Sequence, residues 1–415
     1  MDERNNDLWQ GGPWERSDPR GRMPGAMPPR YVPPRPVLRP RRRKRRFSLP
    51  VCMGLAALLV ALVAIGAVMD SLWPVQLLPG GDEDYAYRQP GHDEEKLDTT
   101  PPAIPRAETG TGVTVELRQD SGESLTYTQI YDKNLPSMVS IQAEDAKSYS
   151  TGTGVVLTAD GYLITNAHVV AGADKVQVAC ADNRVLDAAL VGFDAREDLA
   201  VLKVEADDLI PAEFGDSFAL RCGDPVAAIG DPLGYRSTIT DGIVSALDRD
   251  VEVDGTSMVL IQTSAAINMG NSGGALINQY GQVVGITTVK IVTDDGSAES
   301  LGFAIPSRRV KYVADTLIAG KQVRRGIFGF TVLTRTAQGG GLTLDSVDKT
   351  SDAYAKGLRA GDVLTAADGQ SLNAVEDLVR LKQSMGAGDT VSLTYVRSGQ
   401  SRTVSVALID PDEQT

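Results

Sequence analysis

The chain from about Leu125 to Pro306 is a succession of short apolar or alternating runs that turn residues separate. The runs include MVSIQAE, GVVLTADGYLITNA, KVQVACA, LAVLKVEA, MVLIQT and GALINQYGQVVGITTV. Alternating apolar and polar positions bounded by turns such as Asp-Gly and Tyr-Gly are typical of β-strands. Because hardly any helical period interrupts this pattern, we expect an all-β barrel or sandwich pair.

One amphipathic helix is predicted at the end of this region. Ser307 is its expected N-cap, and Gly320 is its expected stop signal. The apolar positions recur at helical spacing and form one face, which consists of Val310, Val313, Ala314, Leu317 and Ile318. The strands and this helix together predict one folded domain over residues 125–320.

A smaller unit over residues 324–411 mixes the two kinds of pattern. Strand-like runs such as LTLDSV and TVSLTYV accompany a predicted helix from Asn373 to Met385. Asn373 and Glu376 have the spacing of a capping box, with Asn in the place of Ser or Thr. The pattern indicates a separate α+β domain.

The segment Phe47–Val68 is apolar and contains no charged residue. At ~1.5 Å per residue it is long enough to cross a hydrocarbon layer of ~30 Å. The basic block RRRKRR precedes it directly, so the positive-inside rule places the N-terminus in the cytoplasm and the chain beyond Asp70 outside it. We therefore predict a single transmembrane helix over residues 47–68 in the cell membrane. A cleaved signal peptide is the alternative, but so long a basic region exceeds that pattern.

Composition differs on the two sides of this span. The net charge of the chain is −13, yet residues 1–46 hold 13 Lys and Arg against 5 Asp and Glu. These residues are also rich in proline, which indicates a disordered cytoplasmic tail. Residues 69–124 are acidic and contain several prolines, so we expect an extended extracytoplasmic linker. A basic block beside an apolar span is typical of a topology determinant that contacts membrane lipid, and we expect no nucleic-acid partner.

The chain contains three cysteines, of which Cys52 lies in the apolar segment. Cys180 and Cys222 lie in the strand-like runs KVQVACA and LRCGDPVAAIG. Nothing in the sequence brings them together, so two buried free thiols are favoured over a disulfide. A metal site built on these thiols would need further ligands that the sequence does not provide, and we expect no metal.

A serine flanked by glycines is the first candidate for chemistry. Ser272 lies in NMGNSGGALIN, where Gly270, Gly273 and Gly274 allow a tight turn and a close approach of another segment. The main-chain N–H groups of Gly270 and Ser272 could converge beside the hydroxyl and stabilise an oxyanion. A plain glycine-rich turn is the alternative. A serine hydroxyl needs a base to act as a nucleophile, which directs attention to histidine.

Only two histidines occur in the chain, and one of them suits this role. His92 lies in the acidic linker, where we expect a solvated side chain. His168 follows DGYLITNA at the end of an apolar run, and Asp198 opens the later run DLAVLKV. The order His168, Asp198, Ser272 is that of a chymotrypsin-type triad. Nearby carboxylates that we interpret as solvated turn residues are Asp194, Glu197, Asp207 and Asp208.

Several motifs resemble, in order and spacing, those of the HtrA/Deg family of trypsin-like serine proteases. They are GYLITNAHVV, EDLAVLKV, AIGDPLGYRSTITDGIVSA, AAINMGNSGGALIN and LGFAIPS. The last unit, with RGIFGFTV and AYAKGLRAGDVLTAADGQ, looks like the PDZ domain that follows the protease in this family. The resemblance implies a mainly β fold of two perpendicular six-stranded barrels with the active site between them. Met269, Ala275 and Ser264 depart from the residues common in the family.

The resemblance and the motif together assign roles to residues. The catalytic residues are His168 as base, Asp198 as its partner and Ser272 as nucleophile. The oxyanion hole consists of Gly270, Asn271 and Ser272. The substrate pocket consists of Ile267, Ile286, Thr287 and Thr288. The peptide-binding segment of the PDZ domain consists of Ile327, Phe328, Gly329 and Phe330, although either phenylalanine could be a plain core residue. No organic cofactor is implied.

The expected function is that of a membrane-anchored serine endopeptidase that hydrolyses peptide bonds in misfolded or damaged exported proteins. Two alternatives stay open: a signalling protease that cuts one membrane partner when the PDZ domain binds a ligand, and a non-proteolytic chaperone or scaffold. The resemblance also implies a homotrimer and a PDZ domain that binds C-terminal peptides. Residues 294–300 are the candidate for a loop whose ordering a ligand biases.

Overall fold

The computed structural model describes residues 86–87, 99–119, 122–231, 238–253, 256–268, 270–288, 302–336 and 340–411. The predicted transmembrane helix at 47–68, the predicted cytoplasmic tail, His92 and the loop 294–300 lie outside these residues. The chain divides into the units Met1–Gly81 and Asp82–Thr415, and everything described belongs to the second. In the described part of the chain, no helix has both the length and the apolar character that a membrane span needs.

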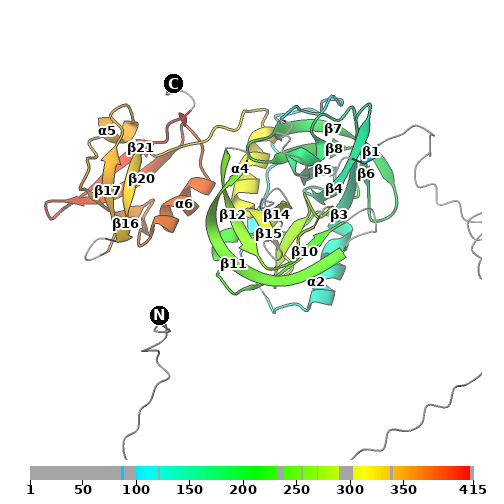
Figure 1. The fold of residues 1–415 in the computed structure, drawn as a ribbon, viewed down its shortest axis with the longest axis horizontal. Helices are drawn as coiled ribbons and strands as arrows, with labels where there is room; N and C mark the ends of the chain where they lie inside the picture. Colours follow the sequence, from blue (N-terminus) through cyan, green and yellow to red (C-terminus); the bar gives the residue numbers. More distant parts are fainter. Residues whose placement is uncertain are drawn as a thin grey trace, which may run out of the picture. The chain divides into compact units, whose positions relative to one another are not determined.

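The first barrel consists of six antiparallel strands. They are β3 (Met138–Glu144), β4 (Ser148–Val156), β5 (Tyr162–Thr165), β6 (Lys175–Ala179), β7 (Val185–Asp194) and β8 (Leu199–Val204). The order is β4-β3-β6-β7-β8-β5, and the pairing of β4 with β5 closes the sheet on itself (Figure 1). The short strand β1 (Ala86–Tyr87) adds to β4 in parallel. Side chains that point inward are apolar and fully buried, as Leu163, Leu190 and Leu202 are.

The second barrel has the same number of strands. They are β10 (Pro225–Gly230), β11 (Thr238–Val253), β12 (Thr256–Thr263), β13 (Ala275–Asn278), β14 (Val283–Thr288) and β15 (Gly302–Pro306). The pairing of β13 with β14 closes the order β13-β10-β11-β12-β15-β14. Two short strands, β9 (Phe214–Gly215) and β2 (Leu117–Arg118), extend the sheet beyond β14. The expectation of two six-stranded barrels is confirmed.

The PDZ domain has its own sheet and core. Its strands are β16 (Phe330–Thr336), β17 (Leu342–Val347), β18 (Val363–Ala367), β19 (Gln370–Ser371), β20 (Thr390–Arg397) and β21 (Gln400–Ala407). Two helices, α5 (Asp352–Ala355) and α6 (Val375–Gln383), complete it. The order β16-β17-β18-β20-β21 leaves β16 at one edge of the sheet. The domain is α+β, as the sequence predicts.

Helix α4 (Ser307–Ile318) joins the barrels into one body. An apolar cluster includes residues of both barrels, such as Val201 and Ile277, together with Val310 and Val313 of this helix. The predicted apolar face and length are therefore confirmed. The predicted cap is wrong, because Pro306 is the N-cap and Ser307 is the first helical residue.

The hydroxyl of Ser307 makes long-range bonds instead of a cap. It accepts a hydrogen bond from the N–H of Ser217 at 3.0 Å and donates one to the carbonyl of Gly215 at 2.7 Å. The PDZ helix departs in a similar way. It begins at Val375, and Asp377 accepts from the N–H groups of Asn373 and Ala374 at 2.7 and 2.9 Å, in place of the predicted Asn373–Glu376 box.

Residues 99–118 differ from the extended linker that we expected. Ile104 and Val115 are 7% and 5% exposed, so they belong to the buried core. The N–H of Gly110 donates to the carbonyl of Ile318 at 2.7 Å, and that of Val115 donates to the carboxylate of Asp315 at 2.7 Å. The segment thus packs along both barrels. Its acidic, proline-containing composition hides this packing because the contacts are far away in sequence.

The sequence also failed to indicate helix α2 (Tyr127–Asn134), although Thr126 and Gln129 form a capping box at its start. Two short 3₁₀ turns, η1 (Leu135–Ser137) and η2 (Ser217–Ala219), connect elements. Cys180 and Cys222 are both free thiols, as expected. Cys180 is buried, but Cys222 is exposed because it lies in the turn before β10 and not inside a strand.

Candidate active site

His168 and Asp198 meet at the end of the first barrel. His168 lies in the short helix α3 (Ala167–Val170) directly after β5, and Asp198 immediately precedes β8. Strands β5 and β8 pair with Thr165 opposite Ala200, so both side chains arrive at the same end of the sheet. Nδ1 of the imidazole is 2.9 Å from Oδ1 and 3.0 Å from Oδ2 of the carboxylate. The structure therefore brings together two of the three predicted catalytic residues.

The Asp198 carboxylate is fully buried and held from several sides. The N–H of His168 donates to Oδ1 at 3.1 Å, and the hydroxyl of Thr288 donates to Oδ2 at 3.1 Å. The side-chain amide of Asn166 donates to the Asp198 carbonyl at 2.9 Å. The backbone at Asp198 has a φ of 52°, a left-handed value that costs a non-glycine residue energy. A carboxylate fixed in this way keeps the proton on Nδ1 and leaves Nε2 as the basic nitrogen.

Ser272 lies in the loop between β12 and β13 and is 4% exposed. This loop comes from the second barrel and approaches the first one closely. Gly273 has a φ of 80°, and a Cβ atom there would lie 2.1 Å from the Thr153 carbonyl oxygen and 2.3 Å from the Thr165 hydroxyl. The N–H of Thr153 also donates to the Ser272 carbonyl at 2.8 Å. The close approach expected of the glycines thus puts the serine loop against the strands that lead to His168.

The main-chain N–H groups of the loop fall into two sets. Those of Asn271, Gly273 and Gly274 donate to the carbonyls of other residues at 2.9 to 3.0 Å. Within the described residues, the N–H groups of Gly270 and Ser272 make no hydrogen bond. These two groups can donate to an incoming oxygen. The third residue predicted for the oxyanion hole, Asn271, has its N–H engaged with the Asn268 carbonyl.

Of the four residues predicted to line the substrate pocket, three have side chains that are buried or hydrogen-bonded within the protein. Ile286 is 0% exposed in the core that the barrels share. The hydroxyl of Thr287 donates to the Asn271 carbonyl at 2.5 Å, and that of Thr288 binds Asp198. Only Ile267 is half-buried, with surface left for a ligand. Sequence patterns did not indicate that the two threonines support the catalytic loops, because their partners are distant in the chain.

The predicted peptide-binding segment of the PDZ domain is partly engaged in its own fold. Ile327 exchanges two main-chain hydrogen bonds of 2.9 Å with Ile409. Phe328 is 9% exposed and stacks on Phe330 with ring centroids 5.3 Å apart, so the core alternative holds for Phe328. Gly329 has a φ of 71°, and a Cβ there would lie 2.3 Å from Cβ of Ser351. The open edge of β16 begins directly after this turn.

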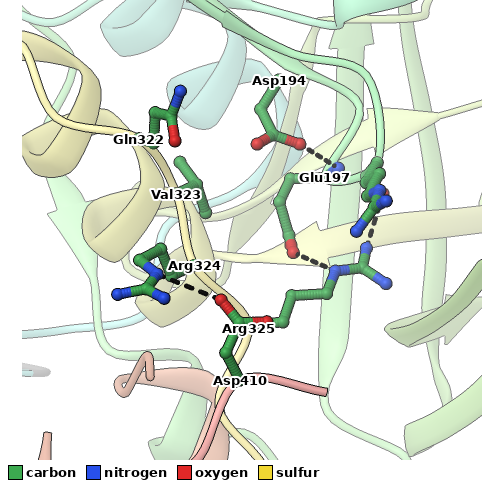
Figure 2. Close-up of a pocket in the computed structure, with 8 residues that line it drawn as sticks. Asp194, Glu197, Gln322, Val323, Arg324, Arg325 and Asp410 are labelled. Carbon is green, nitrogen blue, oxygen red and sulfur yellow. Dashed lines mark hydrogen bonds and ion pairs between the residues drawn. The ribbon is translucent and has the colours of Figure 1, made fainter. Parts of the chain in front are cut away.

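A charged cluster lies on the other side of the Asp198 turn. Figure 2 shows the Arg325 side chain extended to the Glu197 carboxylate and Arg324 directed to Asp410. Arg309 contacts Glu197 through Nε at 2.8 Å and Nη2 at 2.7 Å, and Arg325 contacts it through Nε at 2.8 Å. A cavity of about 500 Å³ adjoins the cluster, and none of the predicted catalytic residues lines it. Glu197 is thus a buried ion-pair residue and not the solvated turn residue that we expected.

Burial and charge act in opposite directions on the carboxylates of this cluster. Burial alone would raise the pKa of Glu197, but the hydrogen bonds and charges of Arg309 and Arg325 outweigh it and lower the pKa to about 2. For Asp194, in contrast, burial is the largest effect, and it raises the pKa of the carboxyl group. Glu197 is therefore ionised next to Asp198 at neutral pH.

Two further contacts join the PDZ domain to the protease domain. Asp248 on β11, which is 6% exposed at its side chain, accepts from Arg380 at 2.7 Å and from Gln383 at 2.9 Å, both on α6. Arg309 on α4 also donates to the Met385 carbonyl at 3.2 Å.

Among the described residues, no three His, Cys, Asp or Glu side chains gather as metal ligands would.

Comparison with known proteins agrees with this architecture. A family model described as "Trypsin-like peptidase domain" matches residues 152–286, and one described as "PDZ domain" matches residues 326–408. The chain is 40% identical over 270 residues to a probable periplasmic serine protease do/HhoA-like of Haemophilus influenzae, over 62% of this chain and 58% of that protein. It is 39% identical over 306 residues to the serine protease Do-like HtrA of Bacillus subtilis, over 67% and 68% of the two chains.

Solved structures agree as well. The structure described as "HtrA-type protease AlgW with tripeptide" is 34% identical, has a TM-score of 0.55 and is covered over 99% of its length by 69% of this chain. The match to the Haemophilus protein spans less than two thirds of that relative. These matches cover 62%, 67% and 69% of this chain. The chain therefore belongs to the HtrA/Do-like family of trypsin-like serine proteases with a PDZ domain, a family of serine endopeptidases.

Proposed function

We propose that this protein hydrolyses peptide bonds with Ser272 as nucleophile, His168 as general base and Asp198 as the residue that orients the imidazole. The observation that carries the proposal is the buried Asp198 carboxylate 2.9 Å from Nδ1 of His168, beside the loop that presents Ser272. No metal takes part in this chemistry.

The reaction follows from these positions. Nε2 of His168 accepts the proton of the Ser272 hydroxyl while Oγ bonds to the carbonyl carbon of the substrate. The carbonyl oxygen becomes negative and receives hydrogen bonds from the N–H groups of Gly270 and Ser272. The imidazolium then gives its proton to the departing amine, and water releases the acyl group from Ser272 by the reverse sequence.

Replacement of Ser272 by Ala tests the proposal directly. The change removes the attacking oxygen and little volume, so the fold should remain while kcat falls on the order of 10⁶-fold. The measurement is cleavage of casein and of a fluorogenic peptide by the purified full-length protein, with circular dichroism as the control for folding. Cleavage at the wild-type rate by Ser272→Ala would refute the assignment of the nucleophile.

The proposal extends to the location of the protein, its substrates and its assembly. The relative in Haemophilus influenzae is described as periplasmic, and the proposed anchor at residues 47–68 places the same domains of this chain outside the cytoplasm. We propose misfolded or damaged exported proteins as substrates, and a homotrimer as the assembly. If the anchor is uncleaved, full-length protein should stay in the membrane after an alkaline wash; a mature chain that begins near Met69 would contradict it.

We also propose that the PDZ domain binds a peptide C-terminus and influences the protease domain. One similar solved structure is described as "HtrA-type protease AlgW with tripeptide". In this chain, the open edge of β16 can accept a peptide strand. The contacts of Asp248 with Arg380 and Gln383 join the PDZ domain to β11 of the second barrel. The contact of Arg325 with Glu197 joins it to the turn that bears Asp198. We propose that peptide binding at the PDZ domain changes the activity of the protease domain through these contacts.

A further inference from the structure

Thr153 touches the serine loop at two points. Its N–H donates to the carbonyl of Ser272 at 2.8 Å, and its hydroxyl donates to the carbonyl of Gly270 at 2.6 Å. The residue lies on β4 of the first barrel, 117 positions before Gly270, and is 0% exposed. One residue of the first barrel therefore holds two carbonyls of a loop that belongs to the second barrel, one through its main chain and one through its side chain.

The direction of the Thr153 hydroxyl bond is fixed by its other partner. The N–H of Asp231 donates to the same hydroxyl oxygen at 2.8 Å. A hydroxyl group has one proton, and the N–H of Asp231 supplies the other hydrogen bond, so the Thr153 proton is directed to Gly270. Asp231 is itself held by the hydroxyl of Ser140 on the neighbouring strand β3.

Thr287, on β14 of the second barrel, also holds the serine loop through two hydrogen bonds. Its hydroxyl donates to the carbonyl of Asn271 at 2.5 Å, and its own carbonyl accepts from the N–H of Gly273 at 3.0 Å. Thr287 is also 0% exposed. The two threonine hydroxyls thus bind consecutive carbonyls, those of Gly270 and Asn271.

The consequence concerns the direction of the N–H groups, because each peptide unit is planar and its carbonyl and N–H point in opposite directions. Thr287 holds the carbonyl of the peptide unit that contains the Ser272 N–H. Thr153 holds the carbonyl of Gly270, and the N–H of Asn271 in the same peptide unit donates to Asn268 at 3.0 Å. The planes of the Gly270–Asn271 and Asn271–Ser272 peptide units are therefore fixed, and the second of them carries the Ser272 N–H. Within the described residues, the N–H groups of Gly270 and Ser272 have no hydrogen-bond acceptor.

We propose that Thr153 and Thr287 are positioning residues for the oxyanion hole. The Thr287 hydroxyl fixes the peptide plane that carries the Ser272 N–H, and the Thr153 hydroxyl fixes the preceding peptide plane, between Gly270 and Asn271, so that the Ser272 N–H faces the substrate and the backbone that follows the Gly270 N–H cannot rotate. Preorganised donors need no rearrangement as charge develops, which is the main source of their catalytic effect. The inference rests on the proposed function, because it assigns a role only if Ser272 is the nucleophile.

The test compares Thr153→Val with Thr153→Ser in the full-length protein. Valine has the shape of threonine without the hydroxyl, whereas serine retains it. For Thr153→Val we expect kcat to fall about 10- to 100-fold, less than the ~10²–10³-fold loss on deleting an oxyanion-hole donor. KM should change little, and Thr153→Ser should recover most of the activity.

A peptide boronic acid with an apolar residue next to boron supplies a readout that a general loss of stability would not change. Its boron forms a tetrahedral adduct with the serine oxygen, and one of its oxygens occupies the oxyanion hole. Affinity for this inhibitor should fall by about the same factor as kcat in Thr153→Val, with the folded fraction confirmed by circular dichroism. Thr287→Val provides the second variant if Thr153→Val does not fold, and it should show the same parallel loss.

The outcomes separate the inference from the proposed function. If Thr153→Val or Thr287→Val is folded and keeps wild-type kcat and boronate affinity, the positioning role is overturned. If Ser272→Ala retains cleavage, the proposed function fails and the positioning role fails with it. An inactive Ser272→Ala together with a fully active Thr153→Val would leave the nucleophile assigned and would remove only the inference.

Discussion

Arg325, at the start of the PDZ domain, donates a hydrogen bond of 2.8 Å to Glu197, the residue that directly precedes Asp198. The second cation on the same carboxylate is Arg309 of helix α4. The cluster therefore connects the turn that bears Asp198, the helix that joins the barrels and the start of the PDZ domain. Asp198 adopts its left-handed backbone conformation next to this fixed point.

The first prediction concerns the pH dependence of stability through Glu197. Its pKa is lowered to about 2 in the folded protein, so its ion pairs stabilise the fold above the ordinary pKa of a glutamate and lose this effect as the pH falls toward 2. Asp194 acts in the opposite direction, because its raised pKa favours the folded state at acidic pH.

Glu197→Gln should therefore lower the free energy of unfolding near pH 7 by about 3 kcal/mol and much less near pH 3. Urea denaturation at the two pH values measures this difference. Asp182→Asn, which weakens an exposed ion pair on the β6–β7 hairpin, is the control and should change stability very little. An equal effect of Glu197→Gln at both pH values would contradict the ion-pair account.

The second prediction concerns Asp198. Asp198→Asn keeps the shape of the side chain but no longer favours the proton on Nδ1 of His168, so kcat should fall about 10⁴-fold at pH 7 with little change in KM. Asp194→Asn is the matched control in the same turn, since an amide oxygen can still accept from the N–H of Glu197. Comparable losses of kcat in both variants would show that activity depends on the conformation of the turn and not on the carboxylate beside His168.

The third prediction concerns communication between the domains. A peptide with an apolar C-terminus should raise the rate at which the full-length protein cleaves a small fluorogenic substrate. Asp248→Asn weakens the contact with Arg380 and Gln383, so it should reduce this stimulation while the peptide affinity, measured by fluorescence anisotropy, stays the same. Arg402→Met, on β21 of the PDZ domain, serves as a control that leaves the stimulation intact. Undiminished stimulation in Asp248→Asn would exclude this contact from the coupling.

The fourth prediction concerns the glycine of the GIFGF segment. Gly329→Ala introduces a Cβ atom 2.3 Å from Cβ of Ser351 at a left-handed φ of 71°, so it should destabilise the PDZ domain by more than the φ value alone would cost. Gly369→Ala supplies that comparison, because its φ of 78° is similar and the space around it is open. Calorimetric unfolding of both variants measures the two costs, and similar values would contradict a steric conflict at Gly329.

Much of the architecture followed from local patterns. Alternating apolar positions predicted the strands of both barrels, and the spacing of Val310, Val313 and Leu317 predicted α4. Glycines around Ser272 predicted a close approach, which Gly273 makes. These features depend on residues close together in sequence, and local spacing therefore carries the information.

The features that sequence patterns missed depend on distant partners. Thr288 finds Asp198 across 90 positions, and Arg325 finds Glu197 across 128. Neither residue stands out among its neighbours by type or spacing. The cap of α4 was misplaced by one residue for a related reason, whereas that of α6 was misplaced locally, because Asp377 and not Glu376 accepts from the N–H groups at the start of the helix. The Ser307 hydroxyl bonds to Gly215 and Ser217, which are about 90 positions away, instead of capping its own helix.

The packed segment at residues 99–118 decides where a shortened version of this protein can begin. A fragment that starts at Leu125, where the strand pattern begins, would lack Ile104 and Val115 and would expose their apolar neighbours to water. It would also lack the N–H group of Val115, which donates to the Asp315 carboxylate on α4. The strand β2, which pairs with β9, would be missing as well. A protease domain prepared for crystallisation or enzyme assays should therefore retain the chain from residue 99 onward, because a start at Leu125 would risk aggregation.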